Sequence, residues 1–158
     1  MNIEITPAHR WQAIDLAPRL RATDKHEVWA SSGLNPEEAL TSSLLHSDPD
    51  MSWCAVIDGT PEIMWGVASL PDVCPPGMWG AVWLLGSDII SEIPRIFWKE
   101  SFESVKRMHE RYPVLTNYIH HENAKSMKWL EGLGFTQCET VHDYGHGRET
   151  FIRYESHV

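Results

Sequence analysis

The chain has 158 residues, of which 42% are hydrophobic, and its 22 acidic against 13 basic side chains give a formal net charge of −9. This length corresponds to one domain, residues 1–158, and the hydrophobic fraction is ordinary for a globular core, which excludes a mainly disordered chain. An acidic chain without a Lys/Arg cluster or a long apolar run favours neither nucleic acid nor membrane as a partner, so we expect a soluble protein.

The first third of the chain predicts a strand followed by helices. Isoleucines alternate with polar residues over 2–6, which is typical of a short strand. Thr6 followed by a proline predicts a helix start, and Pro18 divides or kinks this helix before a second helical pattern over 20–29. An Asn-Pro-Glu-Glu sequence predicts a further helix over 36–45.

The middle of the chain predicts three strands. Two β-rich runs, 53–57 and 63–70, flank Asp58-Gly59, a dipeptide that favours a hairpin turn. The run 78–85 is almost uncharged and has the length of a strand. We expect it to be the central strand, buried on both faces.

The last part of the chain alternates helices and strands. An amphipathic pattern predicts a helix over 93–108, followed by a strand over 114–120. An asparagine cap and a closing glycine predict a helix over 123–133, and the segments 135–141 and 149–154 predict a final hairpin. The complete order predicts one α/β domain.

The segment 123–135 reads Asn-Ala-Lys-Ser-Met-Lys-Trp-Leu-Glu-Gly-Leu-Gly-Phe. Together with the order of elements, it resembles the last helix and following strand of the GNAT superfamily of N-acyltransferases. The resemblance implies the GNAT fold, a mixed and mostly antiparallel sheet of about seven strands flanked by about four helices. It also implies that Asn123 caps the helix while its amide reaches the pantetheine arm of acetyl-CoA, with Ser126 leaving room beside it.

A narrower resemblance concerns the segments 20–27, 83–87 and 129–135, which are similar to small GNAT-like proteins of tailed bacteriophages. Some of these are acetyltransferases and others are internal virion proteins, so the resemblance implies a location in the host cytoplasm or in the phage virion. Two functions follow from it. One is transfer of an acetyl group from acetyl-CoA to a primary amine of a small molecule or protein, by a monomer or homodimer. The other is a catalytically silent protein that serves as a virion component or binds a host protein.

A third and weaker hypothesis is mimicry of nucleic-acid charge, which rests on the net charge alone.

Two departures from the GNAT pattern bear on activity. The loop after the central strand has one glycine and two acidic residues, Asp88 and Glu92, where family members cradle a diphosphate. Leu130 stands where many members have a tyrosine that protonates the departing thiolate.

Three sets of residues are candidates for the site. By the resemblance, the contacts to acetyl-CoA come from Leu84, Leu85, Gly86, Ser87, Asn123 and Ser126. The general base is expected among His120, His121 and Glu122, because these residues lie at the end of the strand that ends near residue 120. The simpler interpretation is that the two histidines are solvated loop residues or that one of them is a core histidine. The residues Arg21, Asp24 and Glu27 share a helix face, where they line the amine side of the cleft or form a surface ion pair.

Other polar and aromatic residues carry less weight. His142, Asp143 and His146 occupy the tip of the closing hairpin, which is a poor preorganised metal site, so we expect no metal. The three cysteines form no metal or disulfide pattern and are expected to be buried and inert. An exposed pair among the tryptophans Trp11, Trp29, Trp65 and Trp79 would favour a protein-binding role.

Overall fold

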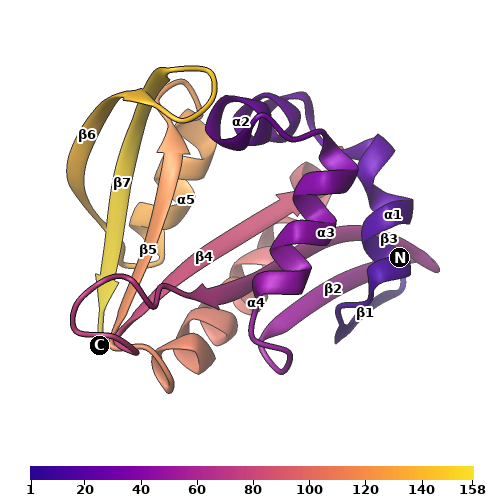
Figure 1. Ribbon diagram of the computed structural model, residues 1–158. Coiled ribbons are helices and arrows are strands. Elements are labelled where there is room, and N and C mark those ends of the chain that lie inside the picture. Colours follow the sequence, from indigo (N-terminus) through magenta and orange to yellow (C-terminus); the bar gives the residue numbers. More distant parts are fainter.

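The computed structural model describes all residues 1–158, which form one seven-stranded sheet in the order β1-β2-β3-β4-β5-β7-β6 (Figure 1). The strands are β1 (Ile3–Pro7), β2 (Ser52–Ile57), β3 (Thr60–Ser69), β4 (Trp79–Gly86), β5 (Val114–His120), β6 (Thr136–Tyr144) and β7 (Glu149–His157). Neighbouring strands are antiparallel except β4 and β5, which are parallel. The mixed, mostly antiparallel sheet predicted from the sequence is confirmed.

Five α-helices flank the sheet: α1 (Arg10–Leu16), α2 (Ala22–Ser32), α3 (Pro36–His46), α4 (Pro94–His109) and α5 (Ala124–Gly132). About four were expected. The additional helix arises because Pro18 lies in a 3-10 turn, Ala17–Arg19, that separates α1 from α2. A second 3-10 turn, Asp88–Glu92, follows β4 and was not predicted. None of the helices combines the length and the apolar composition that crossing a membrane requires.

The helix start predicted at Thr6 is wrong. β1 continues through Pro7, which pairs with Trp53 of β2 at the edge of the sheet, where a missing N–H is tolerated. α1 begins at Arg10 instead, and the side-chain oxygen of Gln12 accepts the His9 N–H at 2.8 Å. The Asp58-Gly59 hairpin is confirmed, with β2 and β3 antiparallel on either side of the turn.

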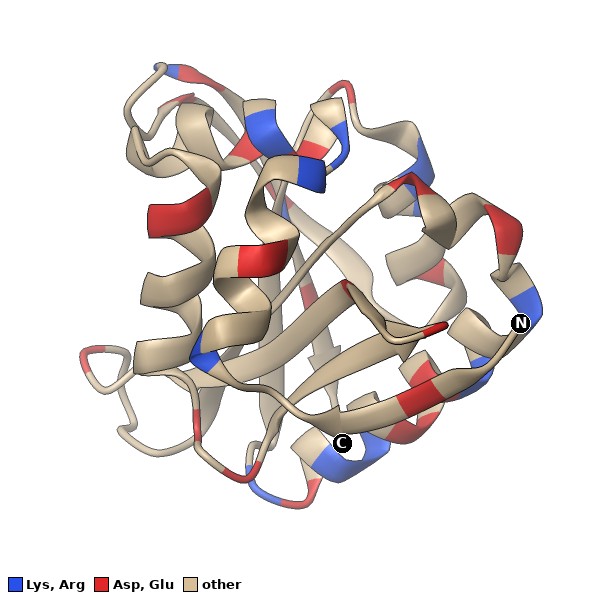
Figure 2. Ribbon diagram, turned by 90° about the vertical axis from the view of Figure 1, so that its right-hand side faces the viewer, with Lys and Arg blue, Asp and Glu red and all other residues tan.

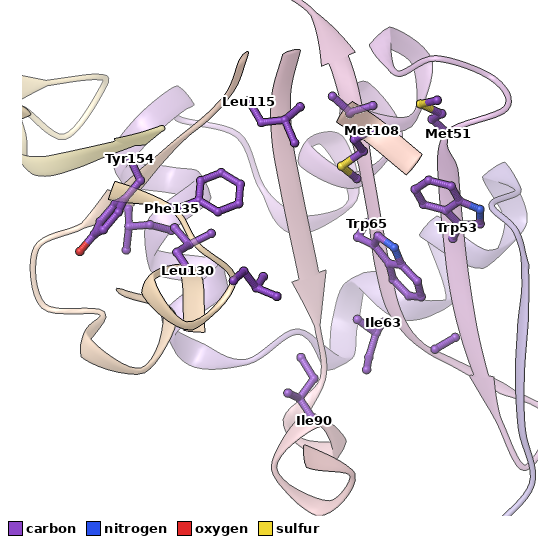
Figure 3. Close-up of a cluster of buried hydrophobic side chains, with 14 of the residues drawn as sticks. Met51, Trp53, Ile63, Trp65, Ile90, Met108, Leu115, Leu130, Phe135 and Tyr154 are labelled. Atoms are coloured by element: carbon purple, nitrogen blue, oxygen red, sulfur yellow. The ribbon is translucent and has the colours of Figure 1, made fainter. Parts of the chain in front are cut away.

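The sheet buries a separate apolar layer on each face. The larger layer includes Trp65 and Met108, and Figure 3 shows Leu130 of this layer next to Phe135 and Tyr154; residues of α4 and α5 belong to it. The smaller layer includes Leu16, Leu40, Cys54 and Met64 and is covered by α1 and α3. Successive residues of β3, such as Met64 and Trp65, point to opposite layers, as strand geometry requires.

The parallel strands β4 and β5 separate soon after they meet. They pair only from Trp79 to Ala81 of β4, and Figure 1 shows the two strands diverging beyond this point, with α2 lying across the open end. β4 is central as predicted, but it is half-buried rather than buried on both faces, because the widening gap removes one neighbour. This gap positions the candidate site.

Charged and thiol side chains are spread over the molecule. In Figure 2, Lys and Arg segments are interspersed with Asp and Glu segments. Cys54 is buried, as expected, and burial raises the pKa of its thiol to about 12. Cys74 and Cys138 are exposed, which corrects the expectation that every cysteine is buried, because they lie in the segment before β4 and on the outermost strand β6.

Candidate active site

A cleft of about 330 Å³ occupies the gap between β4 and β5. Its walls come from the diverging strands and from the helices α2, α3 and α5. Residues of these walls include Arg21, Asp24, Glu27, Leu84, Ser126 and Trp129. Arg21, the residue before α2, and Asp24 and Glu27 of α2 therefore line the cleft together, as their spacing in the sequence indicated.

Two carboxylates of α2 bridge the ends of the diverging strands. Asp24 Oδ2 accepts the main-chain N–H of Gly86, the last residue of β4, at 2.9 Å. Glu27 Oε1 accepts the N–H of His120, the last residue of β5, at 2.7 Å. Because these acceptors lie three residues apart on one helix, α2 holds the two strand ends apart and satisfies main-chain groups that strand pairing leaves free.

Asp24 is a buried carboxylate with a cationic partner. Its side chain is 2% exposed and receives two hydrogen bonds from the Arg21 guanidinium, at 3.1 and 2.9 Å, besides the one from Gly86. Burial raises the pKa of the Asp24 carboxyl, and the contacts with Arg21 and Gly86 oppose that rise. The bidentate pair brings the two opposite charges together, so the pair has no net charge with which to attract another ion.

Glu27 is the carboxylate that lacks a cationic partner. Apart from His120, its one further hydrogen bond comes from the Asn123 side-chain amide, at 3.3 Å. Burial raises the pKa of Glu27 from 4.5 to about 7, because two neutral N–H donors compensate only part of the lost hydration. A carboxyl group with a pKa near neutrality, set in a cleft, is suited to accepting and releasing a proton.

The last residues of β4 differ in the availability of their main-chain groups. Gly86 turns its N–H and C=O toward α2, since the N–H donates to Asp24 and the C=O accepts from the Arg21 N–H. Alternate residues of a strand face the same way, so the N–H and C=O of Leu84 also face the gap, whereas those of Leu85 face β3.

The loop that was expected to supply cofactor contacts is engaged within the protein. The Ser87 N–H donates to the Glu62 main-chain oxygen at 2.9 Å, and the Ser87 hydroxyl donates to the Glu62 carboxylate. Of the four residues from Leu84 to Ser87 that were expected to contact acetyl-CoA, Gly86 and Ser87 therefore have occupied N–H groups, and the main chain of Leu85 faces β3. Leu84 alone presents its main chain to the cleft.

The start of α5 is built as the sequence predicted. The Asn123 side-chain oxygen caps α5 by accepting the Ser126 N–H at 3.3 Å, and the following Phe135 is buried in the larger core layer. The amide nitrogen of Asn123, however, donates to Glu27. Both ends of this side chain thus serve the protein itself, while Ser126 lines the cleft.

The three candidate bases next to β5 do not line the cleft. His120 is 5% exposed, and its Nε2 lies 2.8 Å from Glu149 Oε1. His121 and Glu122 point to solvent, with side chains 43% and 78% exposed. The plainer reading, of one core histidine and solvated neighbours, describes these positions.

A cluster of His26, His120 and Glu149 brings three potential metal ligands within 4.8 Å of one another. His26 Nε2 lies 3.0 Å from the same Glu149 oxygen that His120 contacts. The Glu122 N–H donates to His120 Nδ1 at 3.2 Å, which places the ring proton of the neutral imidazole on Nε2 and directs it to Glu149. A metal-bound histidine normally donates from its second nitrogen, so this geometry describes a hydrogen-bonded cluster rather than a metal site.

Aromatic side chains close the far side of the gap, between α4 and α5. Phe97 and Trp129 stack with ring centroids 5.1 Å apart, and Trp129 Nε1 donates to Ser101 Oγ at 3.2 Å. Leu130, the position that departs from the family tyrosine, is buried in the same wall.

At the hairpin tip, His142, Asp143 and His146 are exposed, and His146 packs edge-on against Trp29.

Two parts of the site were not foreseen. The sequence at Glu149 indicates only the start of a strand and that around Ser42 and Ser43 only a helix, whereas the structure places the two serines in the cleft and Glu149 in the cluster beside it. Both come to the site through packing between segments distant in the sequence. The one sequence feature that could have indicated a site on α3 is the presence of polar residues on its inward face.

Comparison with known proteins identifies the fold. No protein-family model matches the sequence, and no curated protein sequence matches it. Among solved structures, a ribosomal-protein-alanine N-acetyltransferase from Brucella melitensis aligns with a TM-score of 0.73 at 13% identity, covering 98% of this chain and 99% of that one. A GCN5-related N-acetyltransferase from Kribbella flavida aligns with a TM-score of 0.67 at 16% identity, over 99% and 98% of the two chains.

A third structure, a protein from Salmonella typhimurium described as an acetyltransferase and solved with its cofactor acetyl-CoA, has a TM-score of 0.68 at 13% identity. The alignment covers 99% of this chain and 94% of that one. Identities this low establish architecture rather than activity. The chain therefore has the fold of the GNAT acetyltransferases.

Proposed function

We propose that the protein is an N-acetyltransferase that moves an acetyl group from acetyl-CoA to a primary amine. The observation that carries the proposal is the cleft itself, whose lining includes both Leu84, with its main chain facing the gap, and the buried carboxyl of Glu27. The alignment with acetyltransferases, one of them solved with acetyl-CoA, supports the same reading. The bacteriophage origin and the host or virion location remain part of this proposal.

The residues present fit acetyl-CoA unequally along its length. At the thioester end, the gap offers the Leu84 main chain and the small side chain of Ser126. At the diphosphate end, Gly86 and Ser87 have no free N–H, and Asp88 and Glu92 are exposed carboxylates. The remaining donors there are the first-turn N–H groups of α4, which have no side-chain cap and lie next to Arg95.

In this proposal the base is Glu27. When bound, acetyl-CoA would supply the acetyl group as a reactive thioester, whose C–S bond would break as the new C–N bond forms, and the coenzyme would leave as a thiol after its sulfur takes a proton from water. Glu27 would accept the proton of the attacking amine, because its pKa of about 7 balances proton affinity against the ionised fraction at neutral pH. The Leu84 N–H would donate to the carbonyl oxygen as negative charge develops there, in a cleft whose apolar walls strengthen such a bond.

The direct test is acetyl transfer. The purified chain is incubated with acetyl-CoA and a panel of amines, and free thiol release and amine acetylation are both measured. We expect both products to appear together, and to fall sharply in Glu27→Gln but not in the control Glu37→Gln, an exposed residue of α3. Absence of acetylated amine with every acceptor contradicts the proposal.

One observation favours the second candidate, a catalytically silent GNAT-fold protein that serves as a virion component or binds a host protein. Asp24 occupies the Gly86 N–H, so part of the strand end that could hold a cofactor is closed by the protein itself. Trp11 and Trp29 are 59% and 44% exposed, while Trp65 is 7% exposed. For this candidate, acetyl-CoA would have no effect on thermal stability, whereas the enzyme is stabilised by its ligand.

A further inference from the structure

Resting on the proposed function, we propose that the acceptor is a small primary amine that carries no acidic group and has a neutral, hydroxyl-bearing body. The cleft provides one unpaired charge for the amine, and uncharged walls for the remainder of the molecule. The amino alcohols and amino sugars have this chemistry, whereas amino acids and phosphorylated amines do not.

The charged residues of the cleft leave one charge unpaired. Its charged lining residues are Arg21, Asp24 and Glu27. Arg21 and Asp24 are joined by two hydrogen bonds and cancel each other's charge, which leaves Glu27 as the one charge without an opposite partner. An ammonium group entering the cleft is therefore attracted to a single point, at the carboxylate that would also take its proton.

The absence of a free cation in this lining excludes acidic acceptors. A carboxylate or phosphate on the acceptor would lose its hydration in the cleft without gaining an ion pair, because the Arg21 guanidinium is held by Asp24. It would also meet the negative charge of Glu27. A second ammonium group would likewise find no second free carboxylate, so polyamines gain nothing over a single amine.

The walls formed by α2 and α3 suit a neutral body with hydroxyl groups. They combine the apolar residues Val28 and Leu34 with four serines, Ser31, Ser32, Ser42 and Ser43. The Ser31 and Ser32 hydroxyls donate to the Val28 main-chain oxygen, at 3.3 and 2.8 Å, so their oxygens remain acceptors for a ligand O–H. No lysine, arginine or additional acid interrupts these walls.

The dimensions and the closure of the cleft favour a small acceptor over a protein. A volume of about 330 Å³ lies at the lower end of the range of roughly 300–1,000 Å³ for small-molecule sites. The tip of the β6–β7 hairpin is tied to the end of α2, since His146 and Gly147 donate main-chain N–H groups to Ser31 and Ala30. This contact restricts the approach of an extended chain along α2.

The test compares acceptors that differ only by an acidic group: ethanolamine with serine, tyramine with tyrosine, and glucosamine with glucosamine 6-phosphate. We expect kcat/KM to be about 100-fold higher for the acid-free member of each pair. Ser42→Lys, which adds a cation to the cleft wall, is expected to reduce this preference. The control is Thr41→Lys, which places the same charge on the same helix outside the cleft and leaves the preference unchanged.

The outcomes separate this inference from the proposed function. Equal transfer to both members of each pair, or faster transfer to a lysine-containing peptide than to the small amines, overturns the inference and leaves N-acetyltransferase activity standing. Absence of transfer to every amine overturns both. A preference that persists unchanged in Ser42→Lys contradicts the assignment of this wall to the acceptor.

Discussion

The two ends of the gap between β4 and β5 use the same backbone geometry differently. At Leu84 the strand presents main-chain groups to an accessible cleft. At Gly86, two residues further, the equivalent N–H is taken by Asp24 and the C=O by the Arg21 N–H. The comparison shows that a split between parallel strands creates free polar groups, and that the local sequence decides whether the protein or a ligand satisfies them.

The two carboxylates of α2 extend this contrast. Both cap a strand end, but Asp24 has a guanidinium partner and Glu27 has only neutral donors. Burial raises the pKa of Glu27 to about 7 for this reason. Asp24 is therefore suited to holding the structure together, and Glu27 to exchanging a proton with whatever occupies the cleft.

The largest expected effect comes from removing that proton acceptor. Glu27→Gln keeps the size of the side chain and an oxygen that can accept the His120 N–H. Loss of general base catalysis should lower the acetyl-transfer rate by about 100- to 10,000-fold. Steady-state assays at several pH values test this, and a rate within a few-fold of wild type would show that Glu27 is not the base.

The next largest effect concerns the contribution of Asp24 to the stability of the fold. Asp24→Ala leaves a partly buried Arg21 guanidinium and the Gly86 N–H without their acceptor, so unfolding free energy should fall by about 3 kcal/mol. The matched control is Asp15→Ala, which breaks an exposed pair with Arg19 and should cost less than about 1 kcal/mol. Denaturant titrations compare the two. Equal losses would mean that Asp24 does not brace the strand ends.

The pH dependence of stability isolates Glu27. Its pKa is higher in the folded state than the ordinary value of 4.5, so the folded protein retains a proton that the unfolded chain has released. The corresponding stability is present below pH 4.5 and is lost as pH rises through about 7. Between these limits, wild type should lose up to about 3 kcal/mol relative to Glu27→Gln. Parallel stability curves for the two proteins would contradict the raised pKa.

The smallest effect concerns the close approach of Trp98, on α4, to Gly132, on α5. A methyl group at Gly132 would lie 2.4 Å from the Trp98 ring, so Gly132→Ala should cost about 1–3 kcal/mol even though alanine favours helices. The control is Lys128→Ala, at an exposed position of the same helix, which should change stability by less than about 0.5 kcal/mol. Thermal melts of both variants would show whether α4 and α5 are tightly packed at this contact.

Local patterns predicted most of the fold. Alternating apolar residues, the Asp58-Gly59 turn and the Asn123 cap each act over a few residues, and all three are found in the structure. The failures involve distant partners. The start of α1 was misplaced because pairing with β2 extends β1 through Pro7, and β4 was expected to be fully buried because its separation from β5 depends on the assembled sheet.

From the sequence, only those residues of the site that share one helix face could be predicted to lie together. A spacing of three residues put Arg21, Asp24 and Glu27 on one face, and the structure places all three in the cleft. That Asp24 meets Gly86, 62 residues away, and that Glu27 meets His120, 93 residues away, could not be read from the sequence. Those contacts determine which main-chain groups remain free and which carboxyl has a raised pKa.

The most direct test of the central claim is the melting temperature of the purified chain with and without acetyl-CoA. If the gap at Leu84 binds the thioester end of acetyl-CoA, a concentration about 100 times the dissociation constant stabilises the native state by about 2.7 kcal/mol. For a chain of this size that corresponds to a rise of roughly 5–10 °C. An unchanged melting temperature at millimolar acetyl-CoA would contradict the claim and leave the silent GNAT-fold protein as the account of this chain.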